Sequence, residues 1–168
     1  TVKTLSDIDT EDKPVLLRID INSPVVNGRI LDNPRLEAAA ETIKELLSKN
    51  AKLAIIAHQG RKGDSDFLPL DQHAKLLSQH VKTNIKYIND LFLEKASFEI
   101  KNLKEGSAIL LKNVREYEDE FPPFKKDNHY PDFCKQFDAY INDAFSVSHR
   151  TQGSIVIPPK YLPSAIGS

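Results

Sequence analysis

The stretch VLLRIDINSP, residues 15–24, decides the fold class of this chain. It opens with a short run of Val, Leu and Ile, typical of parallel strands that are covered on both faces. Similar or weaker runs follow at residues 53–57, 85–88, 108–111, 139–141 and 154–157, with helical patterns between them. This alternation predicts a Rossmann-like three-layer α/β domain, with a parallel sheet of about six strands and helices on both faces.

Four segments between the runs show the spacing of amphipathic helices. The clearest begins at Asn33-Pro34, where an N-cap residue precedes a proline at the first helical position, and its apolar face continues to Leu47. The others span about residues 70–81, 91–103 and 130–137. Two long loops, 59–69 and 116–129, follow the second and fourth runs. Long loops at strand ends often carry function, so we expect a site near them.

The composition is that of a soluble globular domain. The chain has 168 residues, of which 40% are apolar and 28% charged, which suits one well-cored domain. A net charge of -1 argues against a nucleic-acid partner, and no apolar stretch reaches the ~20 residues that span a bilayer. The polar N-terminus is unlike a signal peptide, and the single cysteine, Cys134, fits a reducing cytosol. We therefore expect a cytoplasmic protein without a membrane partner, in which Cys134 is a small buried side chain.

Arginine is scarce in this chain and unevenly placed. There are six arginines against seventeen lysines, yet four of the six follow apolar runs: Arg35, Arg61, Arg115 and Arg150. The carboxyl ends of parallel strands meet at one edge of a sheet, where ligands of open α/β sheets bind. The planar guanidinium can hold a carboxylate or a phosphate through two hydrogen bonds. The sequence therefore predicts a site for a small phosphorylated acid.

Other polar residues accompany these arginines. Strand alternation places Arg18, Asp20 and Asn22 on one face of the first run, where a carboxylate beside an amide could hold a hydroxyl. The competing interpretation is an Asx-turn before a proline. His58 stands close to Arg61, and His149 directly precedes Arg150. His58 could instead be an ordinary strand-end residue, and any single arginine a surface charge.

Several motifs are absent from the sequence. There is no Walker phosphate loop, no G-x-G-x-x-G, no serine-hydrolase elbow and no Cys/His cluster with zinc spacing. His73 and His80 lie two helical turns apart, too far for a metal clamp, and we expect both to be solvated. The sequence thus predicts an anion site but neither a metal site nor a nucleotide site within this chain.

The ordered segments RIDINSP, NPRLEAAAETI, AHQGR, LLKNVREY, INDAFSVSHRTQGS and KYLPSAIG resemble the N-terminal domain of phosphoglycerate kinase. The form HRTQ-S after DAF resembles archaeal members more than others. This family transfers a phosphoryl group between 1,3-bisphosphoglycerate and ADP, giving 3-phosphoglycerate and ATP, with magnesium on the nucleotide. The resemblance implies that the nucleotide and its magnesium bind a C-terminal domain absent from this chain.

The resemblance also implies residue roles. Asp20 and Asn22 would lie by the hydroxyl and carboxyl end of the substrate, and Arg35 would reach the transferred phosphoryl group as the catalytic residue. The residues that would hold the 3-phosphate are His58, Arg61, Arg115 and Arg150. Arg18 and His149 would support them, Arg18 by bracing Asp20 rather than touching the ligand.

The resemblance further divides the chain into a substrate-binding domain, 1–157, and the start of an interdomain connection, 158–168. We expect the chain to be part of a longer kinase and to bind 3-phosphoglycerate without turnover. The alternative is a stand-alone, non-catalytic binder of small phosphorylated metabolites.

The sequence departs from the family pattern at a few positions. Lys112 stands where the family has Glu, Glu116 replaces the aromatic residue after Arg115, and Ser146 replaces a small Gly or Ala. The segment Gln59-Gly60-Arg61-Lys62 replaces LGRP. With a positive charge at Lys112 and a negative charge at Glu116, the two side chains could pair beside Arg115 and change the direction of its guanidinium group.

Overall fold

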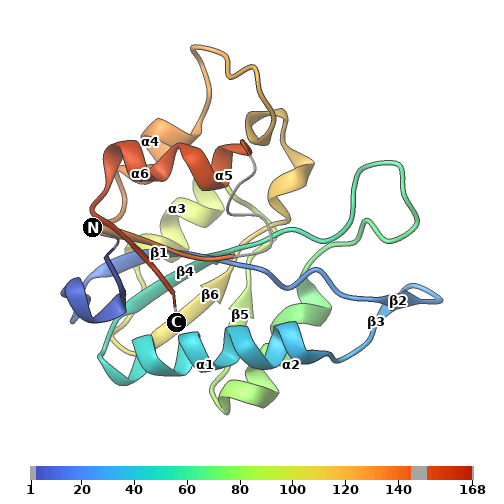
Figure 1. Ribbon diagram of the computed structural model, residues 1–168, viewed down its shortest axis with the longest axis horizontal. Coiled ribbons are helices and arrows are strands. Elements are labelled where there is room, and N and C mark those ends of the chain that lie inside the picture. Colours follow the sequence, from blue (N-terminus) through green and yellow to red (C-terminus); the bar gives the residue numbers. More distant parts are fainter. Residues whose placement is uncertain (1–2, 145–150, 168) are drawn as a thin grey trace.

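Six parallel strands form the central sheet of the computed structural model, which describes residues 3–144 and 151–167 (Figure 1). The strands are β1 (Pro14–Ile19), β4 (Lys52–Ile56), β5 (Ile85–Tyr87), β6 (Ser107–Leu110), β7 (Ala139–Asp143) and β8 (Ser164–Ile166). Their order across the sheet is β5-β6-β4-β1-β7-β8, and every neighbouring pair is parallel. The predicted Rossmann-like fold is confirmed.

Helices cover both faces of the sheet. On one face lie α1 (Pro34–Ser48) and α2 (Asp71–Val81), and on the other lie α3 (Glu94–Lys101), α4 (Tyr130–Cys134), α5 (Gly153–Val156) and α6 (Pro158–Tyr161) (Figure 1). Strand alternation sends Leu17 and Ile19 into the core under α1, and Leu16 into the core under α3 and α4. Within the described ranges no helix is long and apolar enough to cross a bilayer.

The prediction of a last strand at residues 154–157 is wrong. Residues 154–156 belong to α5 and Ile157 is its C-cap; within the helix the Ile155 and Val156 amides donate back to the Gln152 carbonyl. A four-residue apolar run cannot distinguish a helix from a strand. The sixth strand is β8, which pairs with Tyr140, Ile141 and Asn142 of β7. Part of segment 158–168, interpreted from the sequence as a connection, therefore forms an edge of the same sheet.

A small hairpin after β1 was missed in the sequence. Its strands are β2 (Val25–Val26) and β3 (Arg29–Ile30), joined by Asn27-Gly28, whose φ angles are 52° and 75°. Two successive positive φ angles define the turn that an Asn-Gly pair favours between short strands. Gln72 of α2 holds the hairpin, because its Oε1 accepts from the Ile30 amide at 2.9 Å.

The sheet topology marks one place for a ligand. β1 and β7 are neighbours, but the chain leaves β1 toward α1 on one face and leaves β7 toward α5 on the other. The carboxyl ends of β1 and β4 point to the right in Figure 1, the side on which the hairpin lies, whereas the N-terminus lies on the left. Ligands of open α/β sheets bind outside the carboxyl ends, where neighbouring connections diverge in this way.

Candidate functional site

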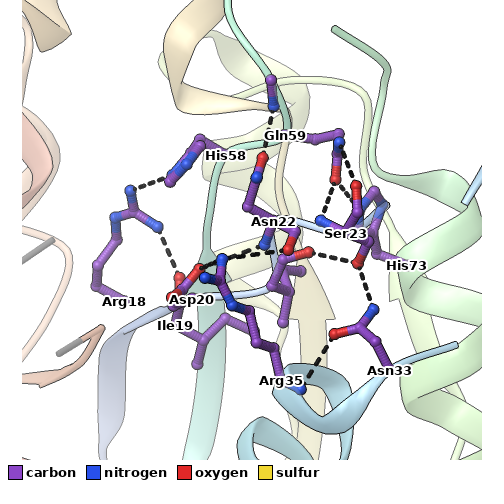
Figure 2. Close-up of polar contacts among 12 residues, drawn as sticks. Arg18, Ile19, Asp20, Asn22, Ser23, Asn33, Arg35, His58, Gln59 and His73 are labelled. Atoms are coloured by element: carbon purple, nitrogen blue, oxygen red, sulfur yellow. Dashed lines mark hydrogen bonds and ion pairs between the residues drawn. The ribbon is translucent and has the colours of Figure 1, made fainter. Parts of the chain in front are cut away.

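The end of β1 meets the start of α1 through Arg35. Its Nη1 atom lies 3.4 Å from Asp20 Oδ1 and 3.3 Å from the Asn22 carbonyl oxygen (Figure 2). Asn33 caps α1 as predicted, because its side chain accepts from the Arg35 amide at 3.1 Å. The Arg35 side chain is 50% exposed and that of Asp20 10%. The ion pair is thus open to solvent on the arginine side, where an anion could compete for the guanidinium.

Gly60 joins the ends of three strands. Its amide donates to Asn22 Oδ1 at 2.7 Å, and its carbonyl accepts from Arg115 Nη1 at 2.9 Å. The φ angle of Gly60 is +69°, and an added Cβ would lie 2.5 Å from the Asp66 carbonyl oxygen. Only glycine suits such a backbone position, so residues after β1, β4 and β6 come together because position 60 lacks a side chain.

Two buried amide side chains fix the long loop after β4. Gln59 is fully buried; its Oε1 accepts from the Ser23 amide at 2.8 Å and its Nε2 donates to the Asp66 carbonyl at 3.1 Å. Asn113 donates to the Gln59 carbonyl at 2.9 Å and accepts from the Arg115 amide at 3.1 Å. Neither residue was among the predicted site residues. The available signal was an amide residue three positions after the end of each of two buried strands.

His73 is fully buried, so the prediction that it is solvated was wrong. Its Nε2 lies 2.9 Å from Gln59 Oε1, and because that oxygen can only accept, the ring donates from Nε2 (Figure 2). Burial lowers the pKa of His73 to about 4. The ring is therefore neutral at physiological pH and supports the loop instead of binding an anion. His80 instead contacts Asp32, at 2.9 Å.

His58 and Arg18 form a buried pair. Arg18 Nη2 lies 2.9 Å from His58 Nδ1, and its Nη1 donates to the Ile19 carbonyl at 2.6 Å (Figure 2). Since arginine can only donate, Nδ1 accepts and the hydrogen of the ring sits on Nε2. We expected Arg18 to brace Asp20; among the described residues its side-chain partners are His58 and Ser154.

Three further predicted site residues have no described side-chain contact in this group. Arg61 is exposed and directly follows Gly60, so its backbone lies in the cluster. Arg150 and His149 fall outside the described residues. The structure therefore links four predicted residues by direct or one-residue hydrogen bonds, namely Asp20, Asn22, Arg35 and Arg115. His58 lies beside this group, just after β4, and its Nδ1 hydrogen bond goes to Arg18 (Figure 2).

Lys112 and Glu116 do not form the expected charge arrangement. In the part of the chain that is described they form no ion pair, and Lys112 Nζ lies 5.9 Å from the centre of the Tyr117 ring. The Arg115 side chain instead donates to the Gly60 carbonyl, which fixes its direction. Asn113 fixes the backbone of the same residue, because it accepts from the Arg115 amide.

Cys134 adds no reactive thiol, and the described acidic residues form no metal-binding cluster. Cys134 is buried as predicted, and burial raises the pKa of its thiol to about 12, so the reactive thiolate is suppressed. Across residues 3–144 and 151–167, no group of His, Cys, Asp and Glu side chains could hold a metal ion. What the edge offers is hydrogen-bond donors and positive charge.

Comparisons with known proteins agree with this geometry. The phosphoglycerate kinase family profile matches residues 5–168. The chain belongs to the phosphoglycerate kinase family. Curated phosphoglycerate kinases from Saccharolobus solfataricus and Methanothermus fervidus are 44% and 43% identical to it, over 99% and 98% of its length. The crystal structure of phosphoglycerate kinase from Pyrococcus horikoshii OT3 covers 98% of the chain with a TM-score of 0.93 and 33% identity.

The match covers only part of those proteins. The chain spans 42% of each of the two curated phosphoglycerate kinases and 42% of the Pyrococcus horikoshii chain. The structure of phosphoglycerate kinase from Coxiella burnetii matches with a TM-score of 0.78 and 27% identity. The predicted family and its archaeal character are both confirmed.

Proposed function

We propose that this chain is the substrate-binding half of a phosphoglycerate kinase, and that it binds 3-phosphoglycerate and 1,3-bisphosphoglycerate at the carboxyl ends of its strands. The observation that carries the proposal is the hydrogen-bonded group in which Gly60 links Asn22 to Arg115, while Arg35 reaches both Asp20 and Asn22. Two guanidinium groups held at one sheet edge form a site for a small polyanion.

We assign a role to each of the predicted site residues. Asp20 and Asn22 would hold the hydroxyl and carboxyl end of the substrate, and His58 with Arg61, Arg115 and Arg150 would hold its phosphate. Half of the Arg35 side chain is exposed, and we assign it to the phosphoryl group in transfer, where charge stabilisation and positioning provide most of the catalysis.

The nucleotide would bind elsewhere. We assign Mg-ATP and Mg-ADP to a C-terminal domain outside these 168 residues, and the transfer to a closed arrangement of the two domains. The chain alone should bind 3-phosphoglycerate without turnover, and the whole kinase would act in glycolysis in the cytoplasm.

Calorimetry on the 168-residue chain tests this proposal. We expect heat from 3-phosphoglycerate, little from glycerate, which lacks the phosphate, and none from ADP. A coupled kinase assay should show turnover only when the nucleotide domain of a related kinase is supplied. Turnover by the chain alone would contradict the assignment of the nucleotide. Binding without any turnover in the two-domain assay would favour the stand-alone binder of phosphorylated metabolites.

A further inference from the structure

A chain of buried polar side chains lies behind His58. Arg18 is fully buried in β1, and its Nε donates to Ser154 Oγ at 2.9 Å. The Ser154 hydroxyl lies 2.6 Å from Oε2 of Glu120, a fully buried residue of the 3₁₀ turn Glu118–Glu120. The side chains thus run from Glu120 through Ser154 and Arg18 to His58, and they connect the loop after β6, helix α5, β1 and the end of β4.

Each hydrogen bond in this chain has only one possible direction. A guanidinium can only donate, so Ser154 Oγ accepts from Arg18 and gives its single hydrogen to Glu120. For the same reason His58 Nδ1 accepts from Arg18, and Nε2 carries the hydrogen. The Arg18 guanidinium therefore determines which imidazole nitrogen is the donor, and Ser154 and Glu120 hold that guanidinium in place.

The fold does not by itself explain these polar groups. Burying a guanidinium and a carboxylate is unfavourable unless both are well compensated, and apolar side chains of similar volume often stabilise a core as well. Among the described residues Arg18 makes no direct ion pair, and it meets Glu120 only through Ser154. Its other bonds point to the carboxyl end of the sheet, to the Ile19 carbonyl and to His58 (Figure 2).

We infer that Arg18 is a positioning residue for His58, held in place by the Ser154 hydroxyl and the Glu120 carboxylate. The arrangement orients the ring and keeps its hydrogen on Nε2, the nitrogen that can donate to an anionic oxygen. The opposite tautomer would direct a lone pair from Nε2 and repel such an oxygen. The identity of that oxygen, a substrate phosphate, rests on the proposed function; the tautomer does not.

Imidazole nitrogen NMR of the 168-residue chain measures the tautomer directly, and a His58→Gln variant assigns the signal. The parent should show a protonated Nε2 and a bare Nδ1. Ser154→Ala removes the link between Arg18 and Glu120, and Arg18→Met removes the donor to Nδ1, so both should give a mixture of tautomers. The affinity for 3-phosphoglycerate should fall about tenfold, as expected for one lost charge-assisted hydrogen bond.

Two further variants separate this role from general damage to the core. Ser154→Thr keeps the hydroxyl and should retain the parent tautomer. Tyr130→Phe removes another buried donor to Glu120, whose Oε1 lies 2.6 Å from the tyrosine hydroxyl, but leaves Ser154 and Arg18 intact, so it too should retain the tautomer. If Ser154→Ala does not fold, Arg18→Met decides.

A parent protein with the hydrogen on Nδ1 would overturn the inference. So would parent-like tautomer and affinity in folded Arg18→Met. If the parent shows the Nε2 tautomer but does not bind 3-phosphoglycerate, the proposed function fails while the role of Arg18 toward His58 stands.

Discussion

Acid should destabilise this domain through His73, a residue with no assigned contact to substrate. Burial lowers the pKa of His73 to about 4 from an ordinary value of 6.5. Well above pH 6.5 the ring is neutral in both the folded and the unfolded chain, so its contribution to the free energy of unfolding is fully present. Between 6.5 and about 4 the unfolded chain takes up a proton that the buried ring does not, so stability falls as pH falls. At roughly 1.4 kcal/mol for each tenfold change, this linkage contributes about 3 kcal/mol.

His73→Gln tests this value. Glutamine does not titrate and can still donate to Gln59 Oε1, so the variant should lose about 3 kcal/mol less than the parent over that pH range. Urea unfolding followed by circular dichroism, at several pH values between 7 and 4, gives the slope of unfolding free energy against pH for the parent and for the variant. Equal slopes for the parent and the variant would refute the reasoning.

Asp143 provides a comparison of opposite sign. Burial raises the pKa of Asp143 to about 6 from 3.8, so its folded form holds a proton that the unfolded form releases. Its contribution therefore falls as pH rises from about 4 to about 6, against the trend set by His73. Asp143→Asn should make the loss of stability on acidification steeper, and a shallower loss would show that the carboxyl group is not held in its protonated form.

Four other changes have defined outcomes. Gly60→Ala places a methyl group 2.5 Å from the Asp66 carbonyl oxygen at a φ of +69°, and should cost roughly 2 kcal/mol or more of unfolding free energy in urea; no change would contradict the tight approach. Arg115→Lys keeps the charge but loses the planar fork, so calorimetry should show about tenfold weaker binding of 3-phosphoglycerate, and parent-like affinity would argue against a bidentate contact. Arg35→Ala should lower kcat of the two-domain kinase far more than it raises KM, since Arg35 is assigned to the transition state; the reverse pattern would assign it to ground-state binding. Cys134, with its thiol pKa raised to about 12, should react with an alkylating reagent at pH 8 far more slowly in the folded than in the unfolded chain, as mass spectrometry would show; equal rates would mean that the thiol is accessible.

The fold was largely predictable because parallel strands buried on both faces give continuous apolar runs, as in residues 15–19 and 53–56. Short apolar runs do not distinguish strands from helices. Residues 154–157 are as apolar as a strand but form the end of α5 and its C-cap, whereas Ser164–Ile166 pairs with β7 as the edge strand of the sheet. Pairing of that kind depends on tertiary position, which a local pattern does not contain.

The placement of the charged residues at this edge of the sheet could be predicted from the sequence, and that of the buried polar groups behind them could not. Arg35 and Arg115 follow strands and could be found by their scarcity and placement. Gln59 and His73 form a buried hydrogen bond between a loop and a helix, and nothing in either local sequence shows that the two side chains meet. A histidine on a helix is ordinarily expected to be exposed to solvent. His73 can be buried because Gln59 Oε1 accepts a hydrogen bond from its Nε2.

The central claim is that the carboxyl ends of the strands hold the phosphoglycerate. A crystal structure of the chain with 3-phosphoglycerate tests this most directly. The account predicts the ligand against Asp20 and Asn22 at one end, with its phosphate within hydrogen-bonding distance of His58 Nε2 and Arg115. A well-ordered ligand bound elsewhere, with this edge of the sheet unoccupied, would contradict it.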